Sequence, residues 1–257
     1  MIDSVEDGAS PHKADNSISI KTLGNSFAIS GRLDAEYYQP KYERLFDALS
    51  KVSTKKLGGP NGIASFKKSI EPGSELYSDN GIPFVRVSDV TRYGLNEPEI
   101  KLPVDFMENI DTLFPTKDTI LFSKDGSVGI AYKLEENAKL ITSGALLHLS
   151  VKNKHEILPD YLTLVLNSRI VQLQAERDSN GAIIQHWKPS EIENVQIPIL
   201  SLNDQRRIAI QVQTSFSHRH RSAQLLSAAK HAVEMAIEQG EDAALTWLKD
   251  RVSQLEV

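Results

Sequence analysis

Near the end of the chain, hydrophobic residues recur every three or four positions over a long stretch. From Asp204 to Gln239 there is no Gly and no Pro. The spacing averages the plain helical period, which predicts one nearly straight helix with an apolar stripe along one side. At about 1.5 Å per residue this helix would be roughly 54 Å long, so we expect it to hold other parts of the molecule apart. The stripe consists of Ile208, Val212, Phe216, Ala223, Leu226, Val233 and Ile237.

The rest of the chain alternates between helical and strand-like patterns. Residues 1–22 are polar and without period, which is typical of a flexible tail. Apolar residues at helical spacing predict helices over Asp34 to Leu49, with Pro40 near the first turn, and over Pro159 to Leu173. A last helix after Gly240 is expected to pair back on the long one.

Between Lys56 and Val151 the pattern changes to short runs bounded by Gly, Pro, Asn or Asp, which predict a β-rich region. The predicted strands are Pro83 to Val87, Thr119 to Phe122, Gly129 to Lys133, Lys139 to Ile141 and Leu146 to Val151. The fold class is therefore α+β. A β-rich domain with flanking helices (23–203) would precede the long helix (204–239) and a short tail helix (240–257).

The middle of the long helix is basic. It reads His218-Arg219-His220-Arg221, and no acidic residue occurs from Gln205 to Val233. This is either a solvated face or a docking surface for an acidic partner or a phosphate backbone. The two histidines point to different sides of a helix, so they cannot chelate one metal ion together.

Composition narrows the class of protein. With 257 residues, 40% of them hydrophobic, the chain suits one large domain or two smaller ones. No apolar run is long enough to cross a bilayer and the first residues are acidic, so we expect a cytoplasmic protein. The absence of cysteine excludes disulfides and thiolate chemistry.

The net charge of −5 does not exclude nucleic-acid binding, because the charges are segregated. Lys51 to Ile70 carries five lysines and no acid. Only the charge that faces the phosphates affects DNA binding, so Lys67 and Lys68 are candidate phosphate contacts. The alternative is a set of solvated loops.

Catalytic signatures are missing from the sequence. There is no Gly-rich phosphate loop, His-Glu-x-x-His, Gly-x-Ser-x-Gly or Asn-Pro-Pro-Tyr motif, and no carboxylate-x-lysine pairing in a strand context. We therefore expect a non-catalytic protein without a metal or cofactor.

Two segments are suited to binding. Residues 122–129 follow an apolar strand and bring Lys124 and Ser127 into a turn with two glycines, which permit close backbone approach to a ligand. Residues 83–90 alternate, so Arg86 and Ser88 would share a strand face, with Arg92 and Tyr93 just beyond. The alternatives are a tight turn with Lys124 solvated, and a structural salt bridge between Arg86 and a carboxylate such as Asp89.

In these segments the chain resembles the specificity subunit of type I restriction-modification systems. The resemblance covers nearly everything from Arg32 onward. Its pieces are 32–42 (Arg-Leu-Asp-Ala-Glu-Tyr-Tyr-Gln-Pro-Lys-Tyr), Pro83 to Val90, Asp118 to Gly129, Ser143-Gly144, Gly181 to Lys188, Ile197-Pro198-Ile199-Leu200 and Gln205 at the opening of the long helix.

The family implies a target recognition domain that binds half of a bipartite site in double-stranded DNA. It also implies a spacer helix that sets the gap and docks methyltransferase subunits, and a translocating restriction subunit in the same assembly. Base-reading residues do not transfer, because recognition loops vary with the sequence that is read. Arg86, Ser88, Arg92, Tyr93, Lys124 and Ser127 are therefore candidates on chemistry and position alone.

Family members usually carry two recognition domains and two spacer helices, whereas this chain has one of each. It therefore resembles a half-length form. Two copies could pair their spacer helices through Ile208, Val212, Phe216, Leu226, Val233 and Ile237 to form a homodimer. The alternatives are a fragment or one half of a heterodimer. Rival functions are a helical assembly module that does not read DNA, and a small nuclease with an unrecognised site.

Overall fold

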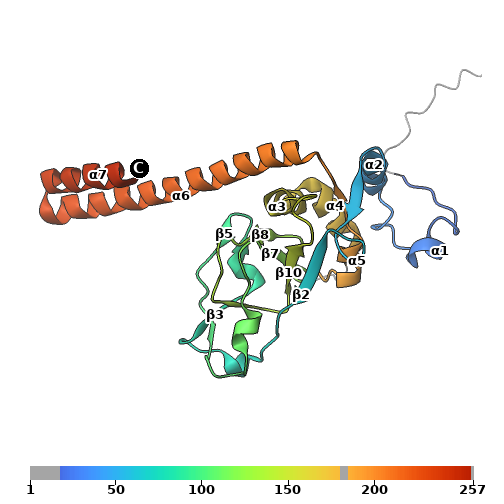
Figure 1. Cartoon of the computed structure of the whole chain (residues 1–257), viewed down its shortest axis with the longest axis horizontal. Coiled ribbons are helices and arrows are strands. Elements are labelled where there is room, and N and C mark those ends of the chain that lie inside the picture. Colours follow the sequence, from blue (N-terminus) through green and yellow to red (C-terminus); the bar gives the residue numbers. More distant parts are fainter. Residues whose placement is uncertain (1–17, 180–184, 256–257) are drawn as a thin grey trace, which may run out of the picture. The chain divides into compact units, whose positions relative to one another are not determined.

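The computed structural model describes residues 18–179 and 185–255 (Figure 1). The chain divides into two compact units, one ending at Leu200 and the other beginning at Ser201. The first is a mixed α and β body and the second consists of two helices, so the predicted α+β class is confirmed. Most residues of the predicted N-terminal tail lie outside the described ranges, and the predicted domain boundaries stay predictions.

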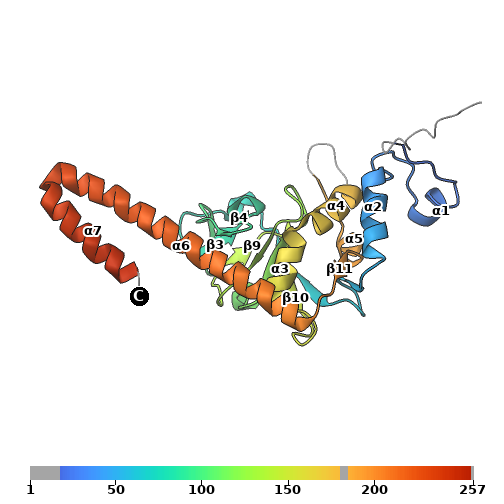
Figure 2. The ribbon, with the colours of Figure 1, turned by 90° about the horizontal axis from the view of Figure 1, so that it is seen from above.

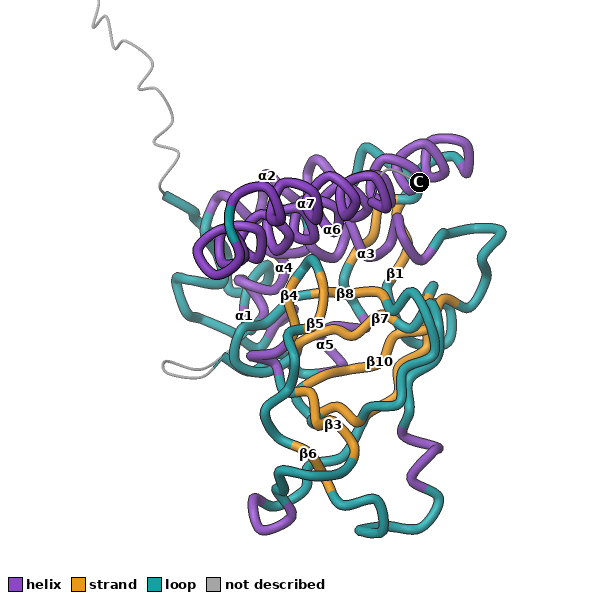
Figure 3. The backbone as a smooth tube through the Cα atoms, turned by 90° about the vertical axis from the view of Figure 1, so that its left-hand side faces the viewer, coloured by secondary structure: helices purple, strands orange, loops and turns teal. Residues whose placement is uncertain are grey.

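A four-stranded antiparallel sheet forms the centre of the first unit (Figure 3). Its two inner strands are apolar on both faces, with Ile120, Leu121 and Phe122 in one and Leu146 and Leu147 in the other fully buried. Such continuous apolar runs are typical of strands covered on both sides. The strand order is β2 (Ala64–Lys68), β10 (Leu146–Val151), β7 (Ile120–Ser123) and β8 (Ala131–Lys133).

A smaller sheet and a hairpin complete the β-rich region. Phe84 and Ile141, both fully buried, lie opposite each other in the parallel pair of this sheet and share an apolar cluster with Leu102 and Leu113. The sheet has the order β6 (Lys101–Leu102), β3 (Ile82–Val85) and β9 (Ile141–Thr142), and the hairpin joins β4 (Val90–Thr91) to β5 (Gly94–Leu95). Three 3-10 turns, Ser74–Leu76, Val87–Asp89 and Ile110–Leu113, lie between these strands.

Three helices of the first unit begin with a proline. Pro40, Pro159 and Pro189 each occupy the first turn, where the missing N–H costs no hydrogen bond. Helix α3 packs on β8, and α2 packs on α4. The helices of the first unit are α1 (Phe27–Ser30), α2 (Pro40–Leu49), α3 (Pro159–Asn167), α4 (Arg169–Asp178) and α5 (Pro189–Glu193). A separate two-stranded sheet pairs β1 (Thr54–Lys56) with β11 (Gln196–Pro198).

Two helix predictions for the first unit need correction. The helix expected from Asp34 begins only at Pro40, because residues 34–38 form turns in which the Tyr37 N–H bonds the Asp34 carbonyl. The single helix expected over Pro159 to Leu173 is two helices, α3 and α4. Ser168 separates them with an extended backbone (ψ 163°), although the apolar spacing continues across the break.

The second unit is a helical hairpin (Figures 1 and 2). Its long helix, α6, runs from Leu202 to Gln239 and begins two residues before the predicted Asp204. Ser201 is the N-cap, because its Oγ accepts a hydrogen bond from the Asp204 N–H (3.2 Å). Helix α7 (Glu241–Leu255) folds back on α6 as expected, with Trp247 stacked edge-on against His231 at 4.6 Å.

The face of α6 that receives α7 is lined by small residues and is not the predicted stripe. Ala228 and Ala232 are buried against α7, whose Ala244 is also buried. The stripe residues Leu226, Val233 and Ile237 remain 59%, 62% and 82% exposed. Small side chains let two helices approach closely, so α7 covers the alanine face and leaves the larger apolar side chains open. Ile208, Val212 and Phe216 are half-buried. Of the described helices, none has the length and hydropathy of a membrane span.

Candidate nucleic-acid interface

Segments far apart in the sequence meet at one edge of the first unit. The Ser143 N–H donates to the Val85 carbonyl (2.9 Å), and the Lys124 N–H donates to the Ala145 carbonyl (2.9 Å). The Gly126 N–H bonds the Gln185 carbonyl (2.9 Å), and Ile70 bridges Ser143. We call residues 70–71, 86–89, 124–127, 143–145 and 185–187 the loop cluster. They converge because antiparallel pairing brings the ends of β2 and β7 to the start of β10.

The loop cluster encloses a shallow pocket of about 300 Å³. Arg86 and Ser88 line it, together with Glu71, Asp125 and Ser143. Sequence reasoning singled out the first two and missed Glu71, for which no sequence signal existed. A Cβ at Gly144 would lie 2.7 Å from Glu71 Oε2, so a side chain at position 144 would require the Glu71 carboxylate to move. The pocket therefore presents hydrogen-bond donors and acceptors side by side.

The backbone of Arg86 is held by Asp89, and its side chain lies beside the same carboxylate. Strand β3 ends at Val85, Arg86 caps the following 3-10 turn and Ser88 lies within it, so the prediction that they share a strand face is wrong. The Arg86 N–H donates to Asp89 Oδ2 (2.8 Å), and the Nε lies 3.8 Å from the same oxygen. This is the salt bridge named above as an alternative. The Arg86 side chain nevertheless stays 39% exposed, so its outer nitrogens can still contact a ligand.

Lys124 is paired with a carboxylate rather than solvated. Its ammonium pairs with Asp125, and the Lys124 side chain is only 17% exposed. Asp125 Oδ1 in turn contacts His186 Nδ1 (2.9 Å) across 61 positions of sequence. The alternative interpretation, a tight turn with Lys124 solvated, is therefore wrong in expecting a solvated side chain at Lys124. Ser127 is exposed at the tip, and its carbonyl accepts a bond from Ser123 Oγ (2.6 Å).

The two lysines of β2 point to opposite faces of the sheet, because they are consecutive strand residues. Lys67 lies opposite the buried His148, and its ammonium donates to the Thr112 carbonyl. Lys68 is exposed on the other face. The structure thus does not place them side by side, and Lys68 is the better candidate for a phosphate contact.

Arg92 and Tyr93 form the tip of the β4–β5 hairpin, and both are exposed. Thr91 Oγ1 accepts a bond from the Tyr93 N–H (3.1 Å) and donates to the Gly94 carbonyl (2.9 Å). The hairpin tip is therefore fixed locally and lies outside the pocket.

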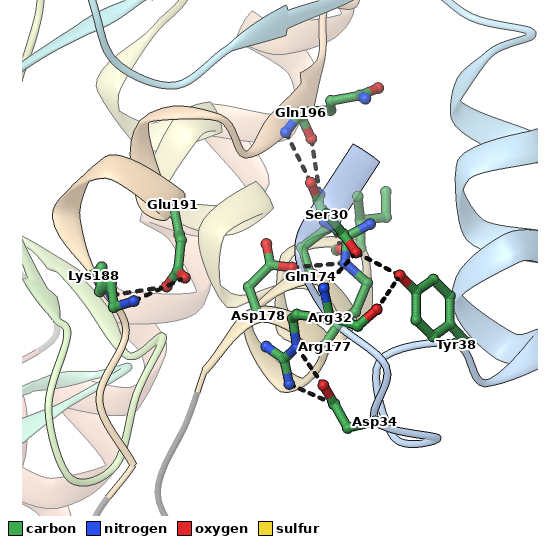
Figure 4. Close-up of polar contacts among 11 residues, drawn as sticks. Ser30, Arg32, Asp34, Tyr38, Gln174, Arg177, Asp178, Lys188, Glu191 and Gln196 are labelled. Carbon is green, nitrogen blue, oxygen red and sulfur yellow. Dashed lines mark hydrogen bonds and ion pairs between the residues drawn. The ribbon is translucent and has the colours of Figure 1, made fainter. Parts of the chain in front are cut away.

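The motif at 32–42 ties the N-terminal segment to the helices (Figure 4). The Arg32 guanidinium donates two hydrogen bonds to the Asp34 carboxylate (2.6 and 2.7 Å). These bonds are the main reason that the pKa of Asp34 is lowered. Tyr38 Oη donates to the Arg32 carbonyl (3.0 Å). Arg32 and Arg177 of α4 both stack on Tyr37, at 4.7 and 4.9 Å. These contacts join the segment before α2 to α4.

His148 gives the first unit a pH dependence. Burial, with a contribution from the charge of Lys67, lowers the pKa of His148 from 6.5 to about 4. The imidazole of the unfolded chain takes up its proton near pH 6.5, but that of the folded protein does not until about pH 4. The free energy of unfolding should therefore fall as the pH falls through this window, by about 3 kcal/mol in total.

Urea unfolding at pH 7 and pH 4.5 checks this expectation. The matched control is the double variant Thr142→Val, His148→Leu, which removes both partners of the Thr142 Oγ1 to His148 Nε2 bond (2.8 Å). It should lose distinctly less stability on acidification than the natural chain. Equal losses in the two proteins would show that His148 is not responsible.

Comparisons with known proteins agree with this architecture. The family model described as "Type I restriction modification DNA specificity domain" matches residues 53–225. The S subunit of a type I restriction-modification system from M. genitalium is similar, with a TM-score of 0.55 at 18% identity over 76% of this chain and 47% of that chain. No curated protein matches the chain.

Two further solved structures have weaker similarity. The HsdS subunit from Thermoanaerobacter tengcongensis gives a TM-score of 0.45 at 18% identity, covering 80% of this chain and 50% of that one. A chain from a structure on complex assembly and conformational transition of the type I R-M system gives 0.47 at 16% identity, covering 82% and 51%. The chain thus spans about half the length of the solved proteins it matches.

Proposed function

Because the chain belongs to the type I restriction modification DNA specificity family, we propose that it recognises a half-site in double-stranded DNA and positions adenine methyltransferase subunits there. The observation that carries the proposal is the extent of the family match. Residues 53–225 include the whole loop cluster and the first part of α6.

The chemistry of the loop cluster supports contact with base edges rather than with phosphates. Glu71, Asp89 and Asp125 would repel a phosphate backbone, but carboxylates accept hydrogen bonds from the amino groups of cytosine and adenine. An arginine whose outer nitrogens are open donates two bonds to guanine, and the Arg86 side chain, beside Asp89 and 39% exposed, offers such nitrogens. Ser88 and Ser127 add hydroxyl groups, which can hydrogen-bond either to a donor or to an acceptor on a base edge. Phosphate contacts then fall to Lys68, Arg92 and Tyr93 around the cluster.

The proposed assembly consists of two copies of this chain joined through α6. Each copy binds half of a bipartite site, and the dimer symmetry makes the site a palindrome. The methyltransferase subunits flip and methylate an adenine, and a restriction subunit that translocates DNA joins them. We assign no catalytic step, metal or cofactor to the chain itself.

Selection from a randomised duplex pool tests the proposal. The full chain, alone and with methyltransferase subunits, is incubated with the pool, its mass is measured by light scattering, and the retained DNA is sequenced. A dimer that enriches a two-part palindrome, with affinity that falls steeply as salt rises, supports it. The rival is an assembly module, favoured by the exposed apolar side of α6. Failure to retain any duplex at low salt, with methyltransferase subunits present, would decide for the rival.

Arg86→Ala should relax the recognised sequence at one position. Losing a two-bond contact to a base costs about 1–3 kcal/mol of discrimination, which is roughly 5- to 150-fold in affinity for the preferred sequence. The measurement repeats the selection with the variant, after circular dichroism has shown that it is folded. Arg44→Ala is the matched control, because Arg44 is an exposed arginine on α2, away from the loop cluster. An equal loss of affinity for all sequences would instead show that Arg86 contacts the phosphate backbone of the DNA.

A further inference from the structure

The loop cluster presents one more polar side chain to solvent, the imidazole of His186. The backbones at Asp125 and His186 pair antiparallel, and next to this pair the Trp187 N–H donates to the Lys124 carbonyl (2.8 Å). Consecutive residues of an extended segment point to opposite faces, so the buried Trp187 turns His186 outward. The His186 side chain is 63% exposed. The core therefore fixes the backbone of His186 and leaves its ring open to a ligand.

Asp125 decides which nitrogen of this ring carries the proton. The ammonium of Lys124 pairs with Asp125 Oδ2, and Asp125 Oδ1 lies 2.9 Å from His186 Nδ1. An ionised carboxylate has no proton to donate, so Nδ1–H is the donor of this hydrogen bond. In a neutral imidazole one nitrogen donates and the other accepts. Nε2 of His186 is therefore an acceptor.

This acceptor lies at the same surface as the candidate base-reading residues. Asp125, which holds the ring, lines the shallow pocket together with Arg86 and Ser88. Among the residues that the structure describes, Nδ1 is the nitrogen of the His186 ring that has a hydrogen-bond partner. Nε2 is on the far edge of the ring from Asp125, where a ligand of the loop cluster can reach it.

We propose that His186 is a specificity-determining residue for DNA, and that its Nε2 accepts a hydrogen bond from an exocyclic amino group in the major groove. Adenine N6 and cytosine N4 carry such groups, whereas guanine and thymine present acceptors at the corresponding places. Asp125 and Lys124 are positioning residues, because they act through the ring of His186. The inference rests on the half-site reading of the proposed function and deepens it by naming a residue and the bases that it selects.

A neutral acceptor at this place complements Arg86. A guanidinium only donates hydrogen bonds, so Arg86 fits guanine, and Nε2 of His186 fits the bases that carry an amino group. A carboxylate would also accept such a bond, but its negative charge repels the neighbouring phosphates. The imidazole accepts without a negative charge, and the charge of Asp125 behind it is balanced by Lys124.

Two substitutions separate base reading from a purely structural role. His186→Asn keeps a nitrogen near the position of Nδ1, which can still donate to Asp125, and removes the ε position. His186→Gln loses the δ nitrogen and keeps an amide at the ε position, which can still accept. In DNA selection with the full chain, His186→Asn should lose preference for the amino-bearing base at one position by roughly 2- to 12-fold, and His186→Gln should keep it.

A purely structural role predicts the reverse order. If His186 only tied its segment to Asp125, His186→Asn would behave like the natural chain and His186→Gln would not. That order, or an unchanged base preference in both variants, would overturn the proposal. An equal loss of affinity for all sequences would also overturn it, because it would assign His186 to a phosphate contact. The matched control is His155→Asn, which changes an exposed histidine beyond the end of β10 and should select the natural sequence.

Base analogues identify the amino group and distinguish adenine from cytosine. In the selected half-site, the adenine is replaced by purine or the cytosine by pyrimidin-2-one, each of which lacks the exocyclic amino group. The natural chain should bind the analogue duplex roughly 2- to 12-fold more weakly than the natural duplex, measured by fluorescence anisotropy. His186→Asn should bind the two duplexes equally. Equal losses in both proteins would assign the amino group to another residue and overturn the proposal.

Asp125→Asn tests the positioning role. An asparagine amide can donate to Nδ1, which leaves the ring proton on Nε2 and makes that atom a donor. The variant should therefore also select guanine, whose N7 and O6 accept, at the position that His186 reads. A loss of stability alone would not change which base is preferred. An unchanged preference in a variant that circular dichroism shows to be folded would overturn the positioning role of Asp125, and the His186 pair decides the proposal if the variant does not fold.

The natural chain separates failure of this inference from failure of the proposed function. If it retains no duplex at low salt with methyltransferase subunits present, half-site reading is overturned and the role of His186 with it. If it selects a half-site that both His186 variants select with the same base preferences, the role of His186 alone is overturned.

Discussion

Replacing Val233 and Ile237 together by lysine should weaken binding to a two-part duplex by about 10²–10⁴-fold, while binding to an isolated half-site stays unchanged. The two side chains are 62% and 82% exposed and lie in the proposed dimer interface. Four buried ammonium groups per dimer would separate the copies. Each copy would then bind its half-site independently and lose the gain in affinity that comes from linking two binding modules.

The measurement compares fluorescence anisotropy of a duplex carrying both half-sites with that of a duplex carrying one. The control is Thr214→Lys, Ser217→Lys, which adds the same charge at two exposed positions of α6 outside the stripe and short of the part covered by α7. It should keep the high affinity for the two-part duplex. If both variants bind that duplex alike, the stripe does not hold the two copies together.

Trp187→Ala should destabilise the first unit by about 3–5 kcal/mol, the range for removing a large aromatic side chain from a core. Trp187 is 1% exposed and packs against Phe122 of β7 at 5.8 Å between ring centroids. Its backbone N–H donates to the Lys124 carbonyl (2.8 Å), so the same residue fixes the 185–187 segment to the 124–127 turn. The loop cluster should therefore lose its arrangement together with the core.

Urea unfolding followed by circular dichroism measures this loss in the full chain. Trp247→Ala is the matched control, because the second tryptophan of the chain lies in the helical hairpin. That variant should leave the unfolding midpoint of the first unit in place. A loss below about 1 kcal/mol for Trp187→Ala would mean that neighbouring side chains fill the cavity left by the indole. Trp187 would then not be the anchor of the loop cluster.

Local pattern determined the helices of the second unit. The Gly-free and Pro-free run from Asp204 to Gln239 predicted α6, and Gly240 marked its end, because helix geometry depends on residues three and four apart. The strands at Leu146–Val151 and Ile120–Ser123 followed from short apolar runs for a similar reason. The resemblance at 83–90, 118–129 and 143–144 predicted the family, which the match over residues 53–225 confirms. The candidate DNA-contacting residues stay predictions.

Tertiary structure alone decided how distant segments meet. The apolar spacing continues across Ser168 without interruption, yet the helix ends there and a second one begins. The reason is that the two helices pack on different neighbours, α3 on β8 and α4 on α2. The contact of Asp125 with His186 and the closeness of Glu71 to Gly144 depend on strand pairing across many residues of sequence. The choice of the alanine side of α6 for α7 depends on how closely two helices approach. Periodicity records which side of an element is apolar, but the partner of that side is set by packing between elements.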